Sequence, residues 1–240
     1  MAAAGGVTAI LWLRLHRREI GVSENEFWAA LWLMVLGGIC GAKALFVLLG
    51  WQHYATGELR FWADFGTGFV FFGGLLGAVS VGLIFAVARG LNFWRGTDYF
   101  AVALPLGHAL GRVGCFWAGC CPGRPPHPVQ LYESAGLLAV AGTCLVLLKQ
   151  VEAGRLRRGM VFCAYLFLYG LLRFLLDPLR ADGRPERFWG MSYQQGLAVG
   201  LMVLGGAGAL FIRYRSTLSR RSPVEEGIAE IRGPKPTDVS

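Results

Sequence analysis

Charged side chains are scarce in this sequence. Asp, Glu, Lys and Arg make up 16% of the 240 residues, whereas 55% are hydrophobic and the mean hydropathy is +0.49. So few charges cannot cover the surface of a soluble protein of this length, which excludes a soluble globular fold. The composition predicts an integral membrane protein. Spans and short connections use nearly the whole chain, so no room is left for a separate soluble domain.

The C-x-x-C spacing is absent, although the chain has six cysteines. Zinc and a redox dithiol therefore have weak support, and we expect neither a metal nor a cofactor. The N-terminus has no basic region ahead of its apolar run and no clear cleavage site, so we expect no signal peptide. The net charge is +8, but the basic residues lie between apolar runs, as in membrane proteins. No nucleic-acid partner is therefore expected.

Seven apolar runs predict an all-α polytopic membrane fold with about seven transmembrane helices. A span needs about 20 residues, so the first run is short: it is either a truncated helix or one that enters a single leaflet. We expect one transmembrane helical domain over residues 1–212 and a polar, disordered cytoplasmic tail over 213–240. The runs are 1–13, 27–51, 65–88, 99–121, 131–148, 159–176 and 191–212.

Lys and Arg are concentrated in alternate connections, which predicts the orientation. The richer set lies at 14–18, 89–95, 149–158 and 213–221. These segments are predicted to be cytoplasmic, with the N-terminus outside and the C-terminus inside. The 177–188 loop is basic although it falls on the outer side, which favours an anionic ligand there.

Glycine is frequent, with 35 residues. Small residues allow membrane helices to approach closely, and four pairs have the G-x-x-x-G spacing that suits such contacts. For any one pair, chance in a glycine-rich chain is an equally good explanation. The pairs are Gly37/Gly41, Gly73/Gly77, Gly107/Gly111 and Gly196/Gly200.

Several charged residues lie within the predicted spans, where a charge is costly and usually functional. By helical rise, Arg112 and Arg173 both lie roughly 20 Å from the inner ends of their helices. Lys43 falls slightly higher on the second span. Two arginines and a lysine at one depth can bind a lipid phosphate. The structural alternative is that both arginines pair with Glu133 and Asp177 and lock the bundle.

Polar residues follow the fourth run. His127 stands among prolines and is a possible proton acceptor, although a loop histidine without a role is nearly as plausible. Gln130, Tyr132 and Glu133 form a polar cluster at a helix start. A thiol near Arg112 would have a lowered pKa, so Cys120 or its neighbour Cys121 could act as a nucleophile, while a structural role is the safer interpretation. His108 is expected to be a packing residue.

Five motifs occur between the second apolar run and the seventh. The central one is G-R-V-G-C-F-W-A-G-C-C-P-G at 111–123, followed by H-P-V-Q-L-Y-E at 127–133. The others are G-A-K at 41–43, G-G-L-L-G at 73–77, Y-G-L-L-R-F-L-L-D-P-L-R-A-D at 169–182 and M-S-Y-Q-Q at 191–195. In this order they resemble the prolipoprotein diacylglyceryl transferase family. The specific signal is H-P-x-Q-L-Y-E after G-R-x-G, whereas glycine matches alone are weak.

The resemblance implies a seven-helix enzyme of the bacterial plasma membrane with a polar active site open to the periplasm. It implies transfer of diacylglyceryl from phosphatidylglycerol to the lipobox cysteine of a prolipoprotein signal peptide, with a thioether formed and glycerol phosphate released. Arg112 would bind the head-group phosphate, and Arg173 would stabilise charge on the departing phosphate. The substrate-binding set would be Lys43, Gly111, Gly114, Gln130, Tyr132, Glu133, Asp177 and Arg180.

The chain departs from the family pattern at several positions. The family usually has Asn at position 115, Asn-Gly-Glu at 118–120 and His at position 72, where this chain has Phe72. The usual base is therefore missing, and His127 or Cys120 would complete the catalytic set. Two further functions stay open: a non-catalytic phospholipid-binding protein on the same scaffold, and a membrane thiol–disulfide enzyme that uses Cys115, Cys120 and Cys121.

Overall fold

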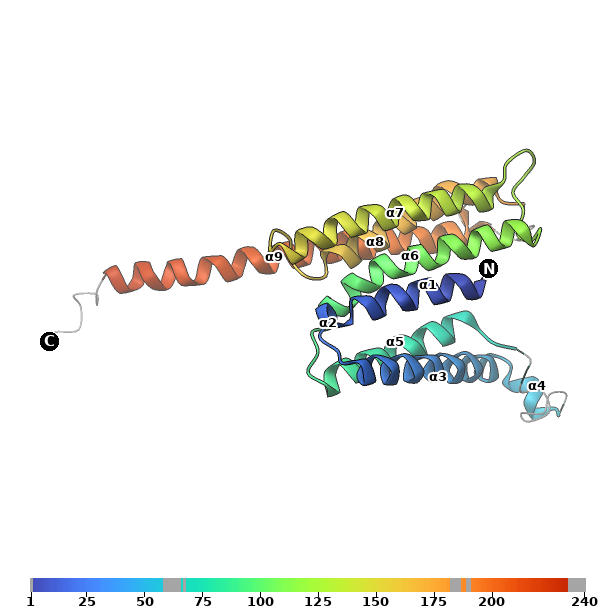
Figure 1. Cartoon of the computed structure of the whole chain (residues 1–240), viewed down its shortest axis with the longest axis horizontal. Helices are drawn as coiled ribbons and strands as arrows, with labels where there is room; N and C mark the ends of the chain where they lie inside the picture. The colour runs from blue at the N-terminus through green and yellow to red at the C-terminus, as the bar shows by residue number, and fades with distance from the viewer. Residues whose placement is uncertain (1, 58–65, 67, 182–186, 189–190, 233–240) are drawn as a thin grey trace. The chain divides into compact units, whose positions relative to one another are not determined.

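The computed structural model describes residues 2–57, 66, 68–181, 187–188 and 191–232, and the described chain is largely helical (Figure 1). A short two-stranded antiparallel sheet pairs β1 with β2. The elements are α1 (Ala2–Leu15), α2 (Arg17–Ile20), α3 (Glu24–Leu49), α4 (Trp51–Ala55), α5 (Phe71–Ala88), α6 (Phe93–Trp117), α7 (Val129–Glu152), α8 (Met160–Leu176), η1 (Asp177–Leu179), β1 (Arg187–Phe188), β2 (Met191–Ser192) and α9 (Tyr193–Arg232).

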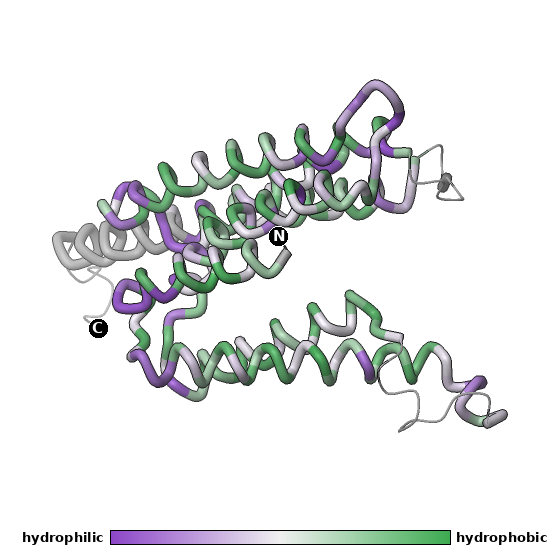
Figure 2. Tube along the Cα trace, turned by 45° about the vertical axis from the view of Figure 1, so that its right-hand side comes forward, coloured by the Kyte–Doolittle hydropathy of each residue, from purple (hydrophilic) through white to green (hydrophobic). Residues whose placement is uncertain are grey.

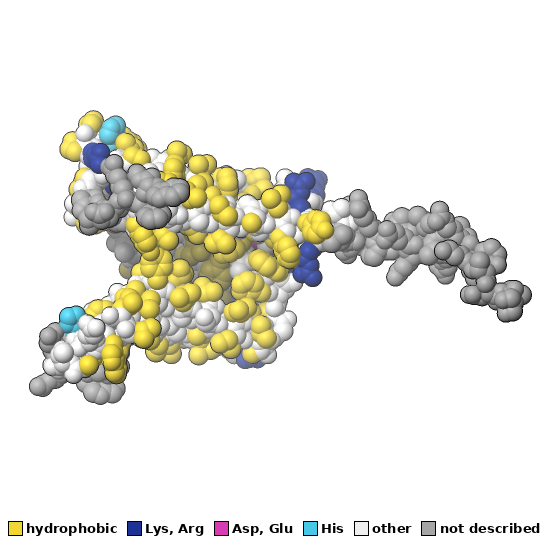
Figure 3. All heavy atoms as spheres, turned by 180° about the vertical axis from the view of Figure 1, so that it is seen from behind, with side chains coloured by type: hydrophobic (Ala, Val, Ile, Leu, Met, Phe, Trp, Pro, Cys, Tyr) yellow, Lys and Arg dark blue, Asp and Glu magenta, His cyan; other side chains and the backbone are white. Residues whose placement is uncertain are grey.

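Six of these helices are long and apolar enough to cross a membrane, and α1 is a shorter apolar helix. Hydrophobic residues run along the helices, and hydrophilic residues gather at the turns (Figure 2). On one face hydrophobic side chains are spread along the described helices, with Lys and Arg near the helix ends (Figure 3). The chain is thus a multi-pass helical membrane protein, and the predicted fold class with a short first helix is confirmed.

The chain divides into two compact units. The unit of residues 12–96 is built on α3 and α5, which lie side by side. A Cβ at Gly77 would lie 2.1 Å from the Gly37 carbonyl oxygen, and one at Gly41 would lie 2.4 Å from the Gly73 carbonyl oxygen. The backbones touch where side chains would not fit, so the predicted contacts of these two glycine pairs are confirmed.

The other unit contains residues 1–11 and 97–240, with α8 packed along both α7 and α9. Its α1 meets α6 closely, since a Cβ at Gly5 would lie 2.3 Å from the Gly107 carbonyl oxygen. The buried carboxylate of Asp98 on α6 accepts hydrogen bonds from the backbone N–H groups of Gly159 (2.6 Å) and Phe162 (3.1 Å) at the start of α8. These two hydrogen bonds satisfy backbone N–H groups that have no partner within the helix, because they lie at its N-terminus.

Two predicted boundaries differ from the structure. The fourth span was predicted to run to residue 121, but α6 ends at Trp117 and Gly119 follows in the left-handed region with φ 67°. The last span was predicted to end at 212, but α9 continues as a helix to Arg232.

Candidate active site

The C-terminal end of α6 is closed by a two-bond cap. The backbone N–H of Gly119 donates to the Phe116 carbonyl, and that of Cys120 donates to the Cys115 carbonyl, both at 3.1 Å. These two bonds with a positive-φ glycine define a Schellman motif, in which the chain turns sharply out of the helix. The Gln130 side-chain amide on α7 then donates to the Cys120 carbonyl at 3.0 Å. The cap and this bond fix the α6–α7 connection relative to both helices.

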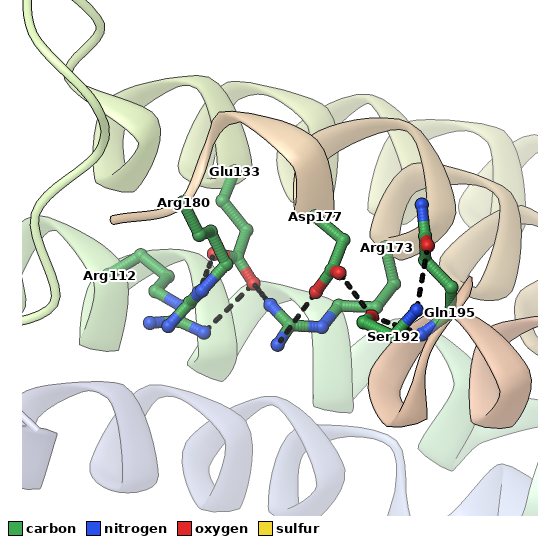
Figure 4. A network of polar contacts seen from close by, with 7 residues as sticks. All are labelled: Arg112, Glu133, Arg173, Asp177, Arg180, Ser192 and Gln195. Atoms are coloured by element: carbon green, nitrogen blue, oxygen red, sulfur yellow. Dashed lines mark hydrogen bonds and ion pairs between the residues drawn. The ribbon is translucent and has the colours of Figure 1, made fainter. Parts of the chain in front are cut away.

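Three guanidinium groups converge on one carboxylate (Figure 4). Arg112 Nη2 on α6 donates to Glu133 Oε1 at 2.9 Å, and Arg173 Nη1 on α8 lies 3.4 Å from the same oxygen. Arg180 Nη1 donates to Glu133 Oε2 at 3.2 Å. The predicted convergence of Arg112 and Arg173 is thus confirmed as geometry. The pairing with Glu133, which was the structural alternative, is present as well.

Backbone pairing places Arg180 at this cluster. Gly123 and Arg180 form an antiparallel bridge, flanked by the Arg124 N–H donating to the Leu179 carbonyl at 2.8 Å. On the other side the Ala181 N–H donates to the Pro122 carbonyl at 3.2 Å. The α6–α7 connection therefore holds the segment after η1 in register, and Arg180 is only 8% exposed.

Asp177 ties the cluster to the start of α9. It lies 3.9 Å from Arg173 Nη2 and accepts a hydrogen bond from the Ser192 hydroxyl. Ser192 also caps α9: its Oγ accepts from the Gln195 N–H at 3.1 Å, while Gln195 Oε1 accepts from the Ser192 N–H at 3.0 Å. This is a capping box. Ser192 and Gln195 were not predicted as site residues, although the S-x-x-Q spacing in M-S-Y-Q-Q is the sequence signal of such a cap.

The cluster has more positive than negative charge. Arg112, Arg173 and Arg180 face Glu133 and Asp177, so three cations and two anions leave one positive charge in excess when all are ionised. Arg112 also has unused capacity, because its buried Nε has no hydrogen-bond partner among the described residues. A guanidinium has five N–H donors suited to phosphate and carboxylate oxygens. This arrangement can accept an anionic group.

A pocket lies beside the cluster. It has a volume of about 400 Å³ and is lined by prolines of the α6–α7 connection together with Phe116, His127 and Gln130. The ring of His127 lies 6.2 Å from that of the exposed Tyr132, measured between centroids. Gln130 and Glu133 are three residues apart on α7 and so share one helix face. The first turn of α7 therefore connects the pocket to the charged cluster.

Cys120 does not have the acidity predicted for it. It lies beyond the end of α6 and is exposed. Hydrogen bonding with the Cys115 thiol is the main cause that raises the pKa of the Cys120 thiol, and the Cys121 thiol adds to the effect. The prediction that Arg112 would lower this pKa is therefore wrong, because thiols rather than a guanidinium dominate its surroundings. At neutral pH Cys120 keeps its proton and is a poor proton acceptor.

The other predicted residues lie around or apart from the cluster. Gly111 and Gly114 flank Arg112 on α6, and a Cβ at Gly111 would meet no atom within 4 Å. His108 lies one turn before Arg112, with its ring 5.8 Å from the Tyr169 ring. Lys43 belongs to the other unit, where it is 3% exposed and its Nζ lies 5.3 Å from the centroid of the Phe46 ring. Within the described ranges, no three His, Cys, Asp or Glu side chains are placed to share a metal ion.

The fold and the site define a class: a multi-pass helical membrane protein with a cationic polar cluster inside its helix bundle. A family model described as prolipoprotein diacylglyceryl transferase matches residues 1–212. The chain therefore belongs to the prolipoprotein diacylglyceryl transferase family, as its motifs predicted.

The relatives carry a transferase name. A Bacillus cereus protein is 31% identical over 226 residues, which cover 83% of this chain and 81% of the relative. A Bacillus cytotoxicus protein is 29% identical over 225 residues with the same coverage of both chains. A Clostridium tetani protein is 26% identical over 204 residues, covering 77% and 80%. All three are named phosphatidylglycerol–prolipoprotein diacylglyceryl transferase.

Proposed function

We propose that this protein transfers a diacylglyceryl group from phosphatidylglycerol to the lipobox cysteine thiol of a prolipoprotein signal peptide. The family and the names of the relatives support the reaction. The observation that carries the proposal in this chain is the convergence of three guanidinium groups within the bundle, with one positive charge in excess. A phospholipid phosphate is the anion that a membrane supplies to such a site.

In the proposed reaction Arg112 binds the head-group phosphate, and its unpartnered Nε supplies a further donor. The acceptor sulfur attacks the glycerol carbon that carries the phosphate ester. A carbon–sulfur bond forms as the carbon–oxygen bond breaks, and glycerol phosphate leaves with the electron pair. Arg173 stabilises the charge that develops on the leaving phosphate, as preorganised donors do in other transfer sites.

The thiol must lose a proton before it attacks, and His127 is the proposed acceptor. It lines the pocket beside α7, and an imidazole ring nitrogen can accept a proton. Cys120 is excluded from this role by its raised pKa. The wall of this pocket includes Gln130, which lies one turn before Glu133. A thiol held in the pocket would thus lie beside the phosphate site.

We further propose the orientation and the setting of the enzyme. The Lys and Arg distribution supports an extracytoplasmic N-terminus, a cytoplasmic C-terminus and a site that faces the periplasm across the bacterial inner membrane. Residues 1–212 would act as one transmembrane domain, followed by a cytoplasmic segment over 213–240. The lipid and the signal peptide would both enter from the membrane.

The test uses the purified full chain in vesicles that contain phosphatidylglycerol, with a synthetic signal peptide that carries one cysteine. Mass spectrometry of the peptide detects the thioether product. We expect product with the unaltered chain and a loss of roughly a hundredfold with Arg112→Ala, the usual effect of removing one preorganised donor. Arg155→Ala is the matched control, because this arginine is exposed in the α7–α8 turn, and it should keep full activity. Equal turnover in both variants would contradict the role of Arg112.

A phospholipid-binding protein without turnover is the second candidate. It is favoured by the state of Cys120, which leaves one proton acceptor instead of two. In that case phosphatidylglycerol would bind to the unaltered chain and not to Arg112→Ala, while no thioether would form under any condition. Binding and turnover measured on the same vesicles separate the two functions.

A further inference from the structure

Three free thiols gather at the end of α6, and the proposed transfer reaction uses none of them. Cys115 lies in the last turn of the helix and is half-buried, while Cys120 and Cys121 are exposed. Of the remaining three cysteines, Cys40 on α3 is exposed but has no second thiol beside it in the sequence, whereas Cys144 on α7 and Cys163 on α8 are buried. Only the α6 group therefore combines several thiols with access to water-soluble reagents.

The helix cap determines which two thiols meet. In a Schellman motif the residue after the positive-φ glycine lies against the residue two before the last helical one, and their side chains are frequently in contact. Here those two residues are Cys120 and Cys115, whose backbones are joined by the 3.1 Å hydrogen bond. Gln130 holds the Cys120 carbonyl at 3.0 Å and so fixes the connection in this conformation. The backbone cap thus brings the two residues together, and a side-chain hydrogen bond joins their thiols.

We propose that Cys115 and Cys120 form a reversible dithiol–disulfide pair that exchanges with an external disulfide, such as oxidised glutathione or a protein disulfide. The exposed Cys120 thiol first loses its proton to solvent, and the small thiolate fraction attacks one sulfur of the external disulfide and releases one thiol. Cys115 then attacks the mixed disulfide and releases the second thiol. One internal disulfide forms, the external disulfide is reduced to two thiols, and the two cysteine protons end on those leaving groups.

The neighbouring Cys121 is a poorer partner for Cys120. Adjacent Cα atoms are about 3.8 Å apart across a trans peptide, which is below the range of about 4.4–6.8 Å that disulfides usually span. Cys121 also has a positive φ of 54°, so its backbone is already in an uncommon conformation. Cys115 and Cys120 are not adjacent in the chain, and neither has a positive φ.

The experiment equilibrates the purified full chain in detergent with oxidised and reduced glutathione in graded ratios. Acid quenching, alkylation with N-ethylmaleimide and peptide mass spectrometry then report each cysteine. Under oxidising ratios we expect alkylation at positions 115 and 120 to fall at least tenfold together, with loss of two hydrogens from the linked segment. Cys121 has no resolving thiol, so it should be found alkylated or as a mixed disulfide with glutathione and never in the internal disulfide. Dithiothreitol should restore all three sites. No lipid or acceptor peptide is present, so failure of the transfer reaction would not affect this result.

Two matched variants make the outcome decisive. Cys121→Ser should form the same internal disulfide, whereas Cys115→Ser should leave Cys120 as a mixed disulfide with glutathione. A disulfide between positions 120 and 121, or free alkylation of both Cys115 and Cys120 at every ratio, would overturn the proposal. Circular dichroism of each variant shows whether it keeps the helical fold, and Cys121→Ser alone suffices if Cys115→Ser does not fold.

Discussion

Glu133 is 2% exposed, and its two carboxylate oxygens serve guanidinium groups from α6, α8 and the segment after η1. A buried carboxylate is stable only when cations and hydrogen bonds replace its water. The guanidinium groups in turn depend on this carboxylate, because it forms ion pairs with Arg112, Arg173 and Arg180. The side chain therefore decides both the stability of the cluster and the geometry that would receive a phosphate.

We expect Glu133→Gln to destabilise the protein strongly. The amide keeps the shape of the side chain, but it removes the negative charge and points N–H donors at guanidinium groups. Breaking a buried ion pair by removing one partner costs about 3–5 kcal/mol. Thermal unfolding in detergent, followed by circular dichroism, should show a clearly lower Tm. Glu19→Gln on α2 is the control, because Glu19 is exposed; an unchanged Tm in both variants would show that Glu133 is dispensable.

At this scale the sequence predicted part of the site. The prediction that Arg112 and Arg173 lie at the same depth needed only the rise per residue of a helix, which does not depend on distant contacts. The Cys120 prediction failed because it assumed proximity to Arg112, whereas the cap turns the chain so that Cys115 is the dominant neighbour. The position of Arg180 depends on a backbone pairing between distant segments, which no local pattern could supply.

At the scale of the helices, the glycine pairs show where two helices approach closely. The pairs on α3 and α5 touch through their backbones, as the G-x-x-x-G spacing predicted. The same spacing at Gly196 and Gly200 on α9 makes no such contact, because a Cβ at either position would meet no atom within 4 Å. The G-x-x-x-G spacing permits a close approach between two helices, but the approach occurs only where a second helix packs against the glycines.

A methyl group at Gly77 tests this contact. Its Cβ would lie 2.1 Å from the Gly37 carbonyl oxygen, so α3 and α5 must separate in Gly77→Ala. Overpacking of this kind costs about 1–3 kcal/mol, and the Tm in detergent should fall. Gly200→Ala is the matched control: it fills open space, and alanine favours a helix by about 1 kcal/mol over glycine. A lower Tm in the control, with none in Gly77→Ala, would contradict the packing argument.

At the scale of the whole molecule, the hydrophobic pattern dictates a multi-pass membrane protein, and the part of the chain that the structure describes has six long apolar helices and one short one. The pattern could predict this because lipid and water sort residues along the whole length of each helix. It could not predict how the units of residues 1–11 with 97–240 and of residues 12–96 are built, since those depend on contacts between distant helices. The proposed orientation in the membrane depends on the loop charges alone, and it can be tested directly by labelling intact cells.

Labelling of intact cells with a membrane-impermeant maleimide should report the orientation. Under the proposed topology the α6–α7 connection is outside, so Cys121, which is exposed and free of the proposed disulfide, should react before the membrane is opened. The α7–α8 turn should be cytoplasmic. In an Arg155→Cys variant that also carries Cys120→Ser and Cys121→Ser, labelling should appear only after permeabilisation. Reaction of position 155 in intact cells, with Cys121 protected until permeabilisation, would reverse the orientation and place the charged cluster near the cytoplasmic side.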